Sequence, residues 1–362
     1  MTQKILISTG GTGGHVVPAT ILYEHLKDQF DVSITTDNRG IKFLDKNKYD
    51  FEIFNVTPIS KNIFLLPFQF FLMIFFIIKS IFFLKKKNIN ILISTGGYMS
   101  LPLCLASKIL SIKIFLFEPN MVLGRSNKFF IKSCDKIFCY SDRIKNFPGK
   151  YIDKIQVIPA LLRKKFYEVK KSESINQDVN LLVIGGSQGA NIFDELIKIP
   201  VIELSKKYKL KIYQQANLVN FKKYKNFYKD NNVNYELFDF NSDVSDIMSK
   251  ANLCLTRAGA STLAELVFLN LPFVAMPLPT AKDNHQYENA FFYKEIGCNW
   301  ILNQNEVYNN ETIINKLVNI IDNKDEYLVK KMNMKNFSYQ NTWNNINQKI
   351  ISLINENRIS KN

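Results

Sequence analysis

The sequence is poor in the residues that build metal sites. Its 362 residues include three histidines and five cysteines, and no Cys-x-x-Cys, His-Glu-x-x-His or Asp-x-Asp motif occurs. Such motifs supply the ligands of zinc sites or hold the divalent cation of a nucleotide diphosphate. We therefore expect no metal ion and no cofactor. The odd number of cysteines, mostly inside apolar runs, indicates reduced thiols, and no signal-peptide layout occurs, so we expect a cytoplasmic protein that is not exported.

Two common nucleotide-binding loops are also absent. The stretch Gly10 to His15 reads GGTGGH, but the dinucleotide pattern Gly-x-Gly-x-x-Gly fails because its third glycine falls at Val16. No Gly-Lys-Ser/Thr follows, which excludes a P-loop. Asp37, which closes the second predicted strand, could still hold a ribose, so an NAD-dependent oxidoreductase stays open as an alternative.

Negative charge is scarce relative to positive charge. The chain has 47 Lys and Arg against 32 Asp and Glu, which gives a formal charge of +15. Such a balance favours an anionic partner, either a phosphorylated substrate, a membrane surface or a nucleic acid. The abundance of Lys, Asn, Ile and Phe is equally consistent with a general residue bias. No dense interleaving of Arg and aromatic residues occurs, so we expect no nucleic-acid partner.

What the sequence contains instead is a repeated pattern of aliphatic residues followed by glycines. ILISTGG occurs at 5–11 and again at 91–97, and a third relative, LLVIGGSQGA, occupies 181–190. Each pattern predicts a buried parallel strand that turns tightly into a helix. Because helix N-termini behind glycine loops bind anions, the three loops predict phosphate or sugar sites.

The order of predicted elements indicates an α/β protein with two Rossmann-like, doubly wound domains. Strand-like and helix-like runs alternate over residues 1–160 and again over 161–335, joined near a polar patch at 170–178. The last segment, 336–362, predicts a helix that packs on the second domain or crosses back to the first. Ligands of such folds bind at the carboxyl ends of the strands, so we expect a cleft between the domains.

An apolar stretch at 63–84 is followed by Lys85 to Lys87. The run is interrupted by Pro67, Gln69 and Lys79, and a full span would place the two ILISTGG loops on opposite sides of a bilayer. We favour a helix lying in the membrane interface with its lysines towards anionic lipid. The alternative is an ordinary crossover helix buried between the sheet and its neighbours.

Three polar positions follow predicted strands or glycine loops. His15 is one of the three histidines and suits a general base, although it could also cap its helix. Ser187 and Gln188 in the third glycine loop offer donors to a diphosphate.

Two further motifs lie in the second half of the chain. TRAGASTLAE at 256–265 contains Thr262 and Glu265 at the spacing of a capping box, so local structure could explain them; in the alternative, Glu265 accepts hydrogen bonds from ribose hydroxyls. The stretch 281–289 places His285, Gln286 and Asn289 at the start of another predicted helix, where they suit sugar hydroxyls.

Taken together, these motifs resemble a bacterial glycosyltransferase family. They are GGTGGHVVPA, STGGYMS, EPN with GRSNK, Arg163, GGSQGA, RAGASTLAE and DNHQYENA, and they extend over almost the whole chain. The family resembled adds N-acetylglucosamine to lipid I, the lipid-linked muramyl-pentapeptide precursor of peptidoglycan, and forms lipid II. The resemblance implies a GT-B architecture, UDP-N-acetylglucosamine as donor, no metal, and peripheral attachment to the cytoplasmic face of the cell membrane through 63–87.

The resemblance also implies roles for individual residues. His15 would be the catalytic base that takes the proton of the acceptor's C4 hydroxyl, with inversion at the anomeric carbon. Glu265 would hold the ribose, and the backbone around Phe240 and Asn241 would read uracil. The full set of implied substrate-binding residues is Thr12, Gly13, Gly14, Asn120, Arg163, Ser187, Gln188, Asn241, Ala260, Ser261, Thr262, Leu263, Ala264, Glu265, His285, Gln286 and Asn289.

Several positions depart from the family pattern. Phe117 and Pro119 stand where the family has histidine and glutamine, and Leu101 stands where a glycine is common. Before Arg163, the sequence Ala160-Leu161-Leu162 replaces the usual Asn-Pro-Val. Rival functions are a glycolipid synthase that transfers a sugar to diacylglycerol, the NAD-dependent oxidoreductase, and a non-catalytic membrane scaffold.

Overall fold

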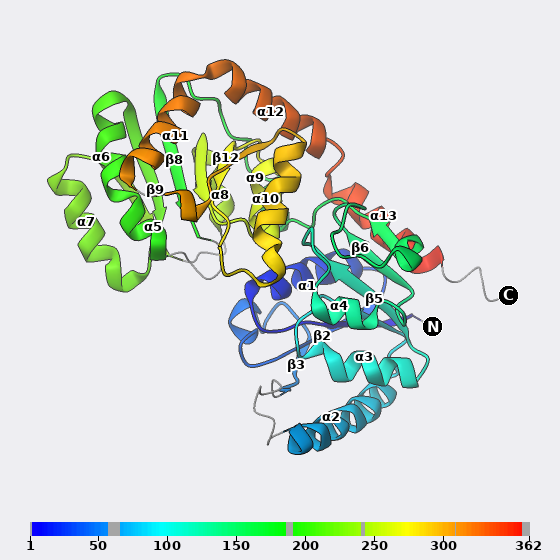
Figure 1. The fold of residues 1–362 in the computed structure, drawn as a ribbon. Helices are drawn as coiled ribbons and strands as arrows, with labels where there is room; N and C mark the ends of the chain where they lie inside the picture. Colours follow the sequence, from blue (N-terminus) through cyan, green and yellow to red (C-terminus); the bar gives the residue numbers. More distant parts are fainter. Residues whose placement is uncertain (1, 57–65, 186–190, 240–242, 308, 357–362) are drawn as a thin grey trace. The chain divides into compact units, whose positions relative to one another are not determined.

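The computed structural model describes residues 2–56, 66–185, 191–239, 243–307 and 309–356 (Figure 1). The chain divides into two compact units. Unit 1 comprises Met1–Leu161 together with Trp343–Asn362, and unit 2 is Leu162–Thr342. Each unit is built on one parallel sheet, which confirms the expected pair of α/β domains. The chain passes from unit 1 to unit 2 after Leu161 and returns to unit 1 at Trp343.

The sheet of unit 1 has seven parallel strands in the order β3-β2-β1-β4-β5-β6-β7. The strands are β1 (Lys4–Ser8), β2 (Asp31–Thr36), β3 (Phe51–Ile53), β4 (Ile91–Ser94), β5 (Lys113–Glu118), β6 (Lys136–Cys139) and β7 (Ile155–Val157). The two ILISTGG copies form neighbouring strands, with Ile5 opposite Ile91 and Ser8 opposite Ser94. The strand order reverses between β1 and β4, so both glycine loops leave the sheet at its switch point, where ligands of this fold class bind.

The helices of unit 1 are α1 (Gly13–Leu26), α2 (Leu66–Lys87), α3 (Ser100–Ile109), α4 (Arg125–Phe130) and α13 (Trp343–Asn355), with 3-10 turns η1 (Ile41–Phe43) and η3 (Gly149–Lys154). Strand β4 is buried at every position and β1 at every position except Lys4, as their aliphatic sequences require. Helix α1 follows β1 through the first glycine loop and buries Val16, Leu22 and Leu26 in the core.

Unit 2 repeats this plan with six parallel strands in the order β10-β9-β8-β11-β12-β13. The strands are β8 (Asp178–Ile184), β9 (Lys209–Gln215), β10 (Asn234–Phe238), β11 (Leu253–Thr256), β12 (Phe273–Ala275) and β13 (Asn299–Ile301). The helices are α5 (Asn191–Leu196), α6 (Lys198–Lys207), α7 (Phe221–Asp230), α8 (Val244–Lys250), α9 (Ala260–Phe268), α10 (His285–Glu295), α11 (Asn310–Asp322) and α12 (Lys324–Ser338). The 3-10 turns are η4 (Lys164–Tyr167), η5 (Leu218–Asn220), η6 (Lys282–Asn284) and η7 (Gln304–Glu306).

Helix α2 presents an aromatic face to solvent. Phe71 is 69% exposed and Phe82 is 70% exposed, whereas Ser80 and Leu84 are buried. The helix packs against α3 on one side (Figure 1). The alternative of an ordinary crossover helix buried between the sheet and its neighbours is therefore wrong. By length and composition, 68–87 is also long and apolar enough to cross a membrane, and 11% of an 18-residue window within it is buried in the protein.

The C-terminal helix α13 packs against α1. The rings of His25 and Trp343 stack with centroids 3.8 Å apart, and Asn347 donates its side-chain N–H to the backbone oxygen of His25 at 3.3 Å. Ile346 and Ile350 on α13 are fully buried. The end of the chain thus completes the core of unit 1 after unit 2 has been traversed.

The buried His25 makes the stability of unit 1 depend on pH. Burial lowers its pKa to about 4, although the nearby Glu24 charge acts in the opposite direction. As pH falls below the ordinary histidine pKa, the unfolded chain takes up a proton that the folded chain does not, so stability decreases. Between pH 7 and pH 5, we expect the wild type to lose about 2 kcal/mol more than His25→Phe, which keeps a ring against Trp343.

Urea unfolding followed by Trp343 fluorescence measures this difference, with Trp300→Phe in both proteins so that unit 2 contributes no tryptophan signal. Equal pH dependence in the two proteins would contradict a neutral, buried His25.

Candidate active site

The first glycine loop joins β1 to the start of α1. Gly11 has φ of +84°, and Thr12 occupies the N-cap position with an extended backbone. The oxygen of Thr12 accepts hydrogen bonds from the N–H groups of His15 and Val16. The N–H groups of the first helical turn, including those of Gly13 and Gly14, have no acceptor within the helix. This end of α1 therefore has the electrostatic character expected of an anion site.

The second glycine loop orients the ring of His15. The Nδ1 atom of His15 lies 2.8 Å from the backbone oxygen of Thr95. Because a carbonyl oxygen can only accept, Nδ1 carries the proton in this bond, and Nε2 is left as the basic nitrogen of the neutral ring. His15 thus bonds to another loop rather than capping its own helix. The sequence did not reveal this contact, since it joins residues 80 positions apart.

Glycine is required where the two loops meet. A Cβ atom on Gly96, whose φ is +89°, would come within 3.3 Å of His15 Cε1. A Cβ atom on Gly97, whose φ is +87°, would lie 3.2 Å from the backbone oxygen of Gly10. The duplicated motif therefore supplies one loop that begins the helix of His15 and a second loop that supports its ring.

Asn120 belongs to a network centred on Glu118 at the end of β5. The Oε1 atom of Glu118 accepts from the backbone N–H of Asn120 at 3.2 Å and from its side chain at 3.0 Å. Oε2 accepts from the Gly124 N–H at 2.7 Å and from the Asn127 side chain at 3.0 Å. Sequence reasoning missed this role of Glu118. Phe117, which replaces the family histidine, is buried with its ring edge-on to Tyr140.

Two residues implied as substrate ligands meet in unit 2. The Nη2 atom of Arg163 lies 3.4 Å from Oε1 of Glu265. Glu265 is 7% exposed, and burial raises the pKa of its carboxyl, an effect that the neighbouring Arg163 opposes. A carboxylate kept in a buried position against its preference for water is typical of functional sites.

The capping-box alternative for Glu265 is wrong. Helix α9 begins at Ala260 with Gly259 at its N-cap and without a side-chain cap, so Thr262 lies inside the helix. Glu265 pairs with Arg163 instead. Ser261 is half-buried, whereas Leu263 and Ala264 are buried in the core of unit 2. The N–H of Leu263 donates to the Gly259 oxygen at 3.0 Å within the first turn of the helix.

The start of α10 is tied to the loop after β11. Gln286 Oε1 accepts from the N–H groups of Ala258 at 3.3 Å and Leu278 at 3.0 Å. Asn289 is buried and donates to the Ala258 oxygen at 3.1 Å. His285 Nδ1 lies 2.8 Å from the Lys282 oxygen. Gln286 and Asn289 therefore hold these two segments together.

The remaining implied residues lie outside the described part of the chain: Ser187, Gln188, Phe240 and Asn241. Within the described part, no group of three or more His, Cys, Asp and Glu side chains is arranged to hold a metal ion.

Comparison with known proteins decides the family. Residues 5–139 match the N-terminal domain of glycosyltransferase family 28, and residues 180–348 match its C-terminal domain. The chain belongs to glycosyltransferase family 28.

Two relatives match most or nearly all of the sequence. A Pelagibacter ubique protein named UDP-N-acetylglucosamine--N-acetylmuramyl-(pentapeptide) pyrophosphoryl-undecaprenol N-acetylglucosamine transferase is 64% identical over 357 residues, which cover 99% of this chain and 100% of that protein. A Rickettsia felis protein of the same name is 35% identical, with 89% of this chain and 91% of that protein covered.

Solved structures share the fold. Acinetobacter baumannii MurG superposes with a TM-score of 0.77 at 23% identity, covering 98% of this chain and 99% of that chain. A Neisseria meningitidis UDP-GlcNAc 2-epimerase bound to UDP-GlcNAc gives a TM-score of 0.65 at 13% identity, covering 98% and 100%. These likenesses confirm the GT-B-like fold of this family 28 member.

The Arg163 and Glu265 pair generates a prediction about stability and binding. Burial raises the pKa of Glu265 in the folded protein. As pH rises above the ordinary glutamate pKa, the unfolded chain therefore ionises this group more readily than the folded chain, and folding stability decreases. We expect Glu265→Gln to be more stable than the wild type at pH 7, with a gap that shrinks towards pH 4. The same variant should bind UDP about 10- to 100-fold more weakly, the range for one hydrogen bond to a charged group.

Thermal unfolding and calorimetric titration with UDP measure the two effects. Glu311→Gln, which removes an exposed carboxylate of unit 2, is the control and should change neither quantity much. A variant that loses stability and keeps its affinity would contradict the role of Glu265.

Proposed function

We propose that the protein transfers N-acetylglucosamine from UDP-N-acetylglucosamine to the C4 hydroxyl of the muramyl sugar of lipid I and so forms lipid II. The observation that carries this proposal is the 64% identity over 99% of the chain to a transferase of that name. The two joined glycine loops and the buried Glu265 give the proposal a physical basis.

The proposed reaction is a single displacement with inversion and without a metal ion. Nε2 of His15 takes the proton of the C4 hydroxyl as its oxygen forms the new bond to the anomeric carbon. The bond between that carbon and the UDP oxygen breaks, and UDP leaves with the electron pair. The hydrogen bond to Thr95 places the proton of the neutral ring on Nδ1 and fixes the ring, which reduces the reorganisation needed during proton transfer.

The substrate contacts follow the same assignment. Thr12, Gly13 and Gly14 bind pyrophosphate at the N-terminus of α1. On the donor side, Arg163 contributes positive charge and Glu265 accepts from the ribose hydroxyls. His285, Gln286 and Asn289 contact the sugar, together with the first turn of α9 at 260–264. Asn120 contributes from the loop after β5, and Ser187, Gln188 and Asn241 complete the donor site.

The rivals are less favoured. The relatives are named as transferases to the muramyl precursor, which disfavours the glycolipid synthase. The hypothesis of an NAD-dependent oxidoreductase requires Asp37 to bind the ribose of the cofactor. Both oxygens of Asp37 already accept hydrogen bonds from Gly11, Arg39 and Gly40, so this carboxylate is occupied within the protein.

We further propose that α2 attaches the protein to the cytoplasmic face of the cell membrane without spanning it. The exposed rings of Phe68, Phe71, Phe75 and Phe82 would enter the interface, and Lys85 and Lys86 would lie near anionic headgroups. Unit 1 contains both this helix and the two ILISTGG loops. The unit that binds the membrane would therefore also bind the lipid-linked acceptor.

The first test is transfer of labelled N-acetylglucosamine from its UDP donor to a short-chain lipid I analogue, with EDTA present and diacylglycerol as a competing acceptor. We expect product from lipid I, and His15→Ala should lower kcat by about 10²- to 10⁴-fold, the usual contribution of a general base. Gln29→Ala, at an exposed position after the same helix, is the control.

Labelling of diacylglycerol would identify the protein as a glycolipid synthase instead. Loss of all transfer in EDTA would refute the metal-independent mechanism. Undiminished transfer by His15→Ala would remove His15 as the base.

The membrane proposal is tested by vesicle flotation. We expect Phe71→Ser combined with Phe75→Ser to weaken binding to vesicles containing anionic phosphatidylglycerol by at least about tenfold, because each ring contributes apolar burial. Phe129→Ser, which removes an exposed ring on α4, is the matched control. Equal flotation of the double variant and the wild type would exclude α2 as the attachment site.

A further inference from the structure

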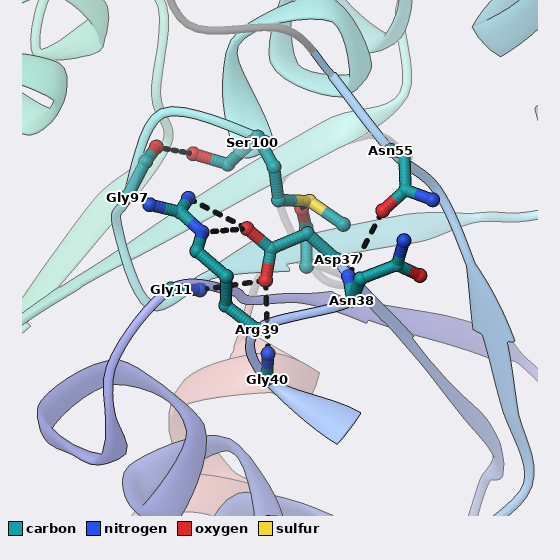
Figure 2. Close-up of polar contacts among 10 residues, drawn as sticks. Gly11, Asp37, Asn38, Arg39, Gly40, Asn55, Gly97 and Ser100 are labelled. Atoms are coloured by element: carbon teal, nitrogen blue, oxygen red, sulfur yellow. Dashed lines mark hydrogen bonds and ion pairs between the residues drawn. The ribbon is translucent and has the colours of Figure 1, made fainter. Parts of the chain in front are cut away.

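Asp37 directly follows β2 and belongs to neither ILISTGG segment. Its side chain nevertheless holds the first glycine loop. Its Oδ1 atom accepts from the N–H of Gly11 at 2.9 Å and of Gly40 at 3.0 Å (Figure 2). Its Oδ2 atom accepts from Arg39 Nε at 2.8 Å and Nη2 at 2.6 Å. Asp37 is 5% exposed, whereas the side chain of Arg39 is 61% exposed.

These contacts keep Asp37 charged despite its burial. Burial alone would raise the pKa of the carboxyl. The hydrogen bonds from Gly11, Arg39 and Gly40, together with the Arg39 charge, outweigh burial and lower the pKa below its usual value. The two backbone N–H groups are therefore bound by a full negative charge, which makes these hydrogen bonds stronger than neutral ones.

The loop is held between Asp37 and the second glycine loop. A Cβ atom on Gly10 would come within 2.8 Å of Met99 Cγ and 3.2 Å of Asp37 Cγ. Met99 follows the second loop, where Ser100 Oγ also donates to the Gly97 oxygen at 2.8 Å (Figure 2). With Gly10 packed on both sides and Gly11 bonded to Asp37, the chain enters α1 at a fixed position.

We infer that Asp37 is a positioning residue for the transfer reaction: it acts through Gly11 to place His15, and Arg39 neutralises its charge beside the acceptor's pyrophosphate. This inference rests on the proposed function. His15 lies four residues after Gly11, and its N–H bonds to the Thr12 oxygen within the same turn. A displacement of about 1 Å at a reacting group can cost about 100-fold in rate.

Removing Asp37 and removing Arg39 should affect the reaction differently. Without the Asp37 carboxylate, the loop loses its anchor and kcat falls. Without Arg39, the carboxylate keeps its two backbone donors, so the loop stays in place. An uncompensated negative charge then lies beside the site of an anionic acceptor and opposes its binding. Arg39 removal should therefore raise the KM for the acceptor more than it lowers kcat.

The experiment compares Asp37→Ala, Asp37→Asn, Arg39→Gln and the exposed control Asp28→Asn. The chain has three histidines, so selective ¹⁵N-histidine labelling gives a readable side-chain spectrum of the whole protein. We expect the His15 signals to shift in Asp37→Ala while those of His25 and His285 stay unchanged. We also expect kcat to fall about 100-fold in Asp37→Ala and less in Asp37→Asn, whose amide oxygen still accepts from Gly11.

Wild-type transfer to the lipid I analogue is measured in the same series, which separates the two ideas. If the wild type transfers nothing, the proposed function fails, and the His15 spectrum alone decides the positioning role. If the wild type is active and Asp37→Ala matches it in kcat and in the His15 signals, the inference is overturned. If Asp37→Ala does not fold, Asp37→Asn decides on the same two readouts. An Arg39→Gln variant with unchanged acceptor KM would overturn the role of Arg39.

Discussion

The in-register pairing of β1 with β4 is the constraint on which the candidate site depends. It brings Ser8 opposite Ser94, so the two glycine loops leave the sheet side by side and Thr95 can reach the ring of His15. The close approach works only because Gly96 and Gly97 adopt positive φ where a Cβ atom would meet His15 or Gly10. A sequence repeated in two places is thus explained by parallel pairing: matching strands place matching loops at one edge of the sheet.

Much of the fold could be predicted from the sequence. Strands such as β1, β4 and β8 are short aliphatic runs that end in glycine, and this local signal indicates buried parallel strands. The C-terminal segment was harder to assign. Helix α13 has an apolar stripe that includes Ile346 and Ile350, but its pattern does not specify which unit it covers. In the structure α13 packs on α1 of unit 1, where His25 stacks on Trp343, a contact between residues far apart in the chain.

The candidate site could be predicted only in part. Residue types in the motifs that follow β1 and β11 indicated His15 and Glu265, because their chemistry is carried by single side chains. The contacts that hold the surrounding loops were missed, since each joins a side chain to a backbone atom or side chain elsewhere in the chain: the Thr95 oxygen with His15, Glu118 with Asn127, and Asp37 with Gly11. The capping-box spacing at Thr262 misled in the same way, because spacing cannot show that the helix begins at Ala260.

The place of α13 in the chain has a consequence for how the protein forms during synthesis. Unit 2 is a continuous segment, Leu162–Thr342, whereas unit 1 needs residues from both ends of the chain. Domains generally fold as units while the chain emerges from the ribosome. Unit 2 can therefore fold before α13 is synthesised, but the surface of α1 around His25 stays uncovered until residues 343–355 are made. A chain without residues 343–362 would retain both ILISTGG segments and lose the helix that packs on α1 around His25.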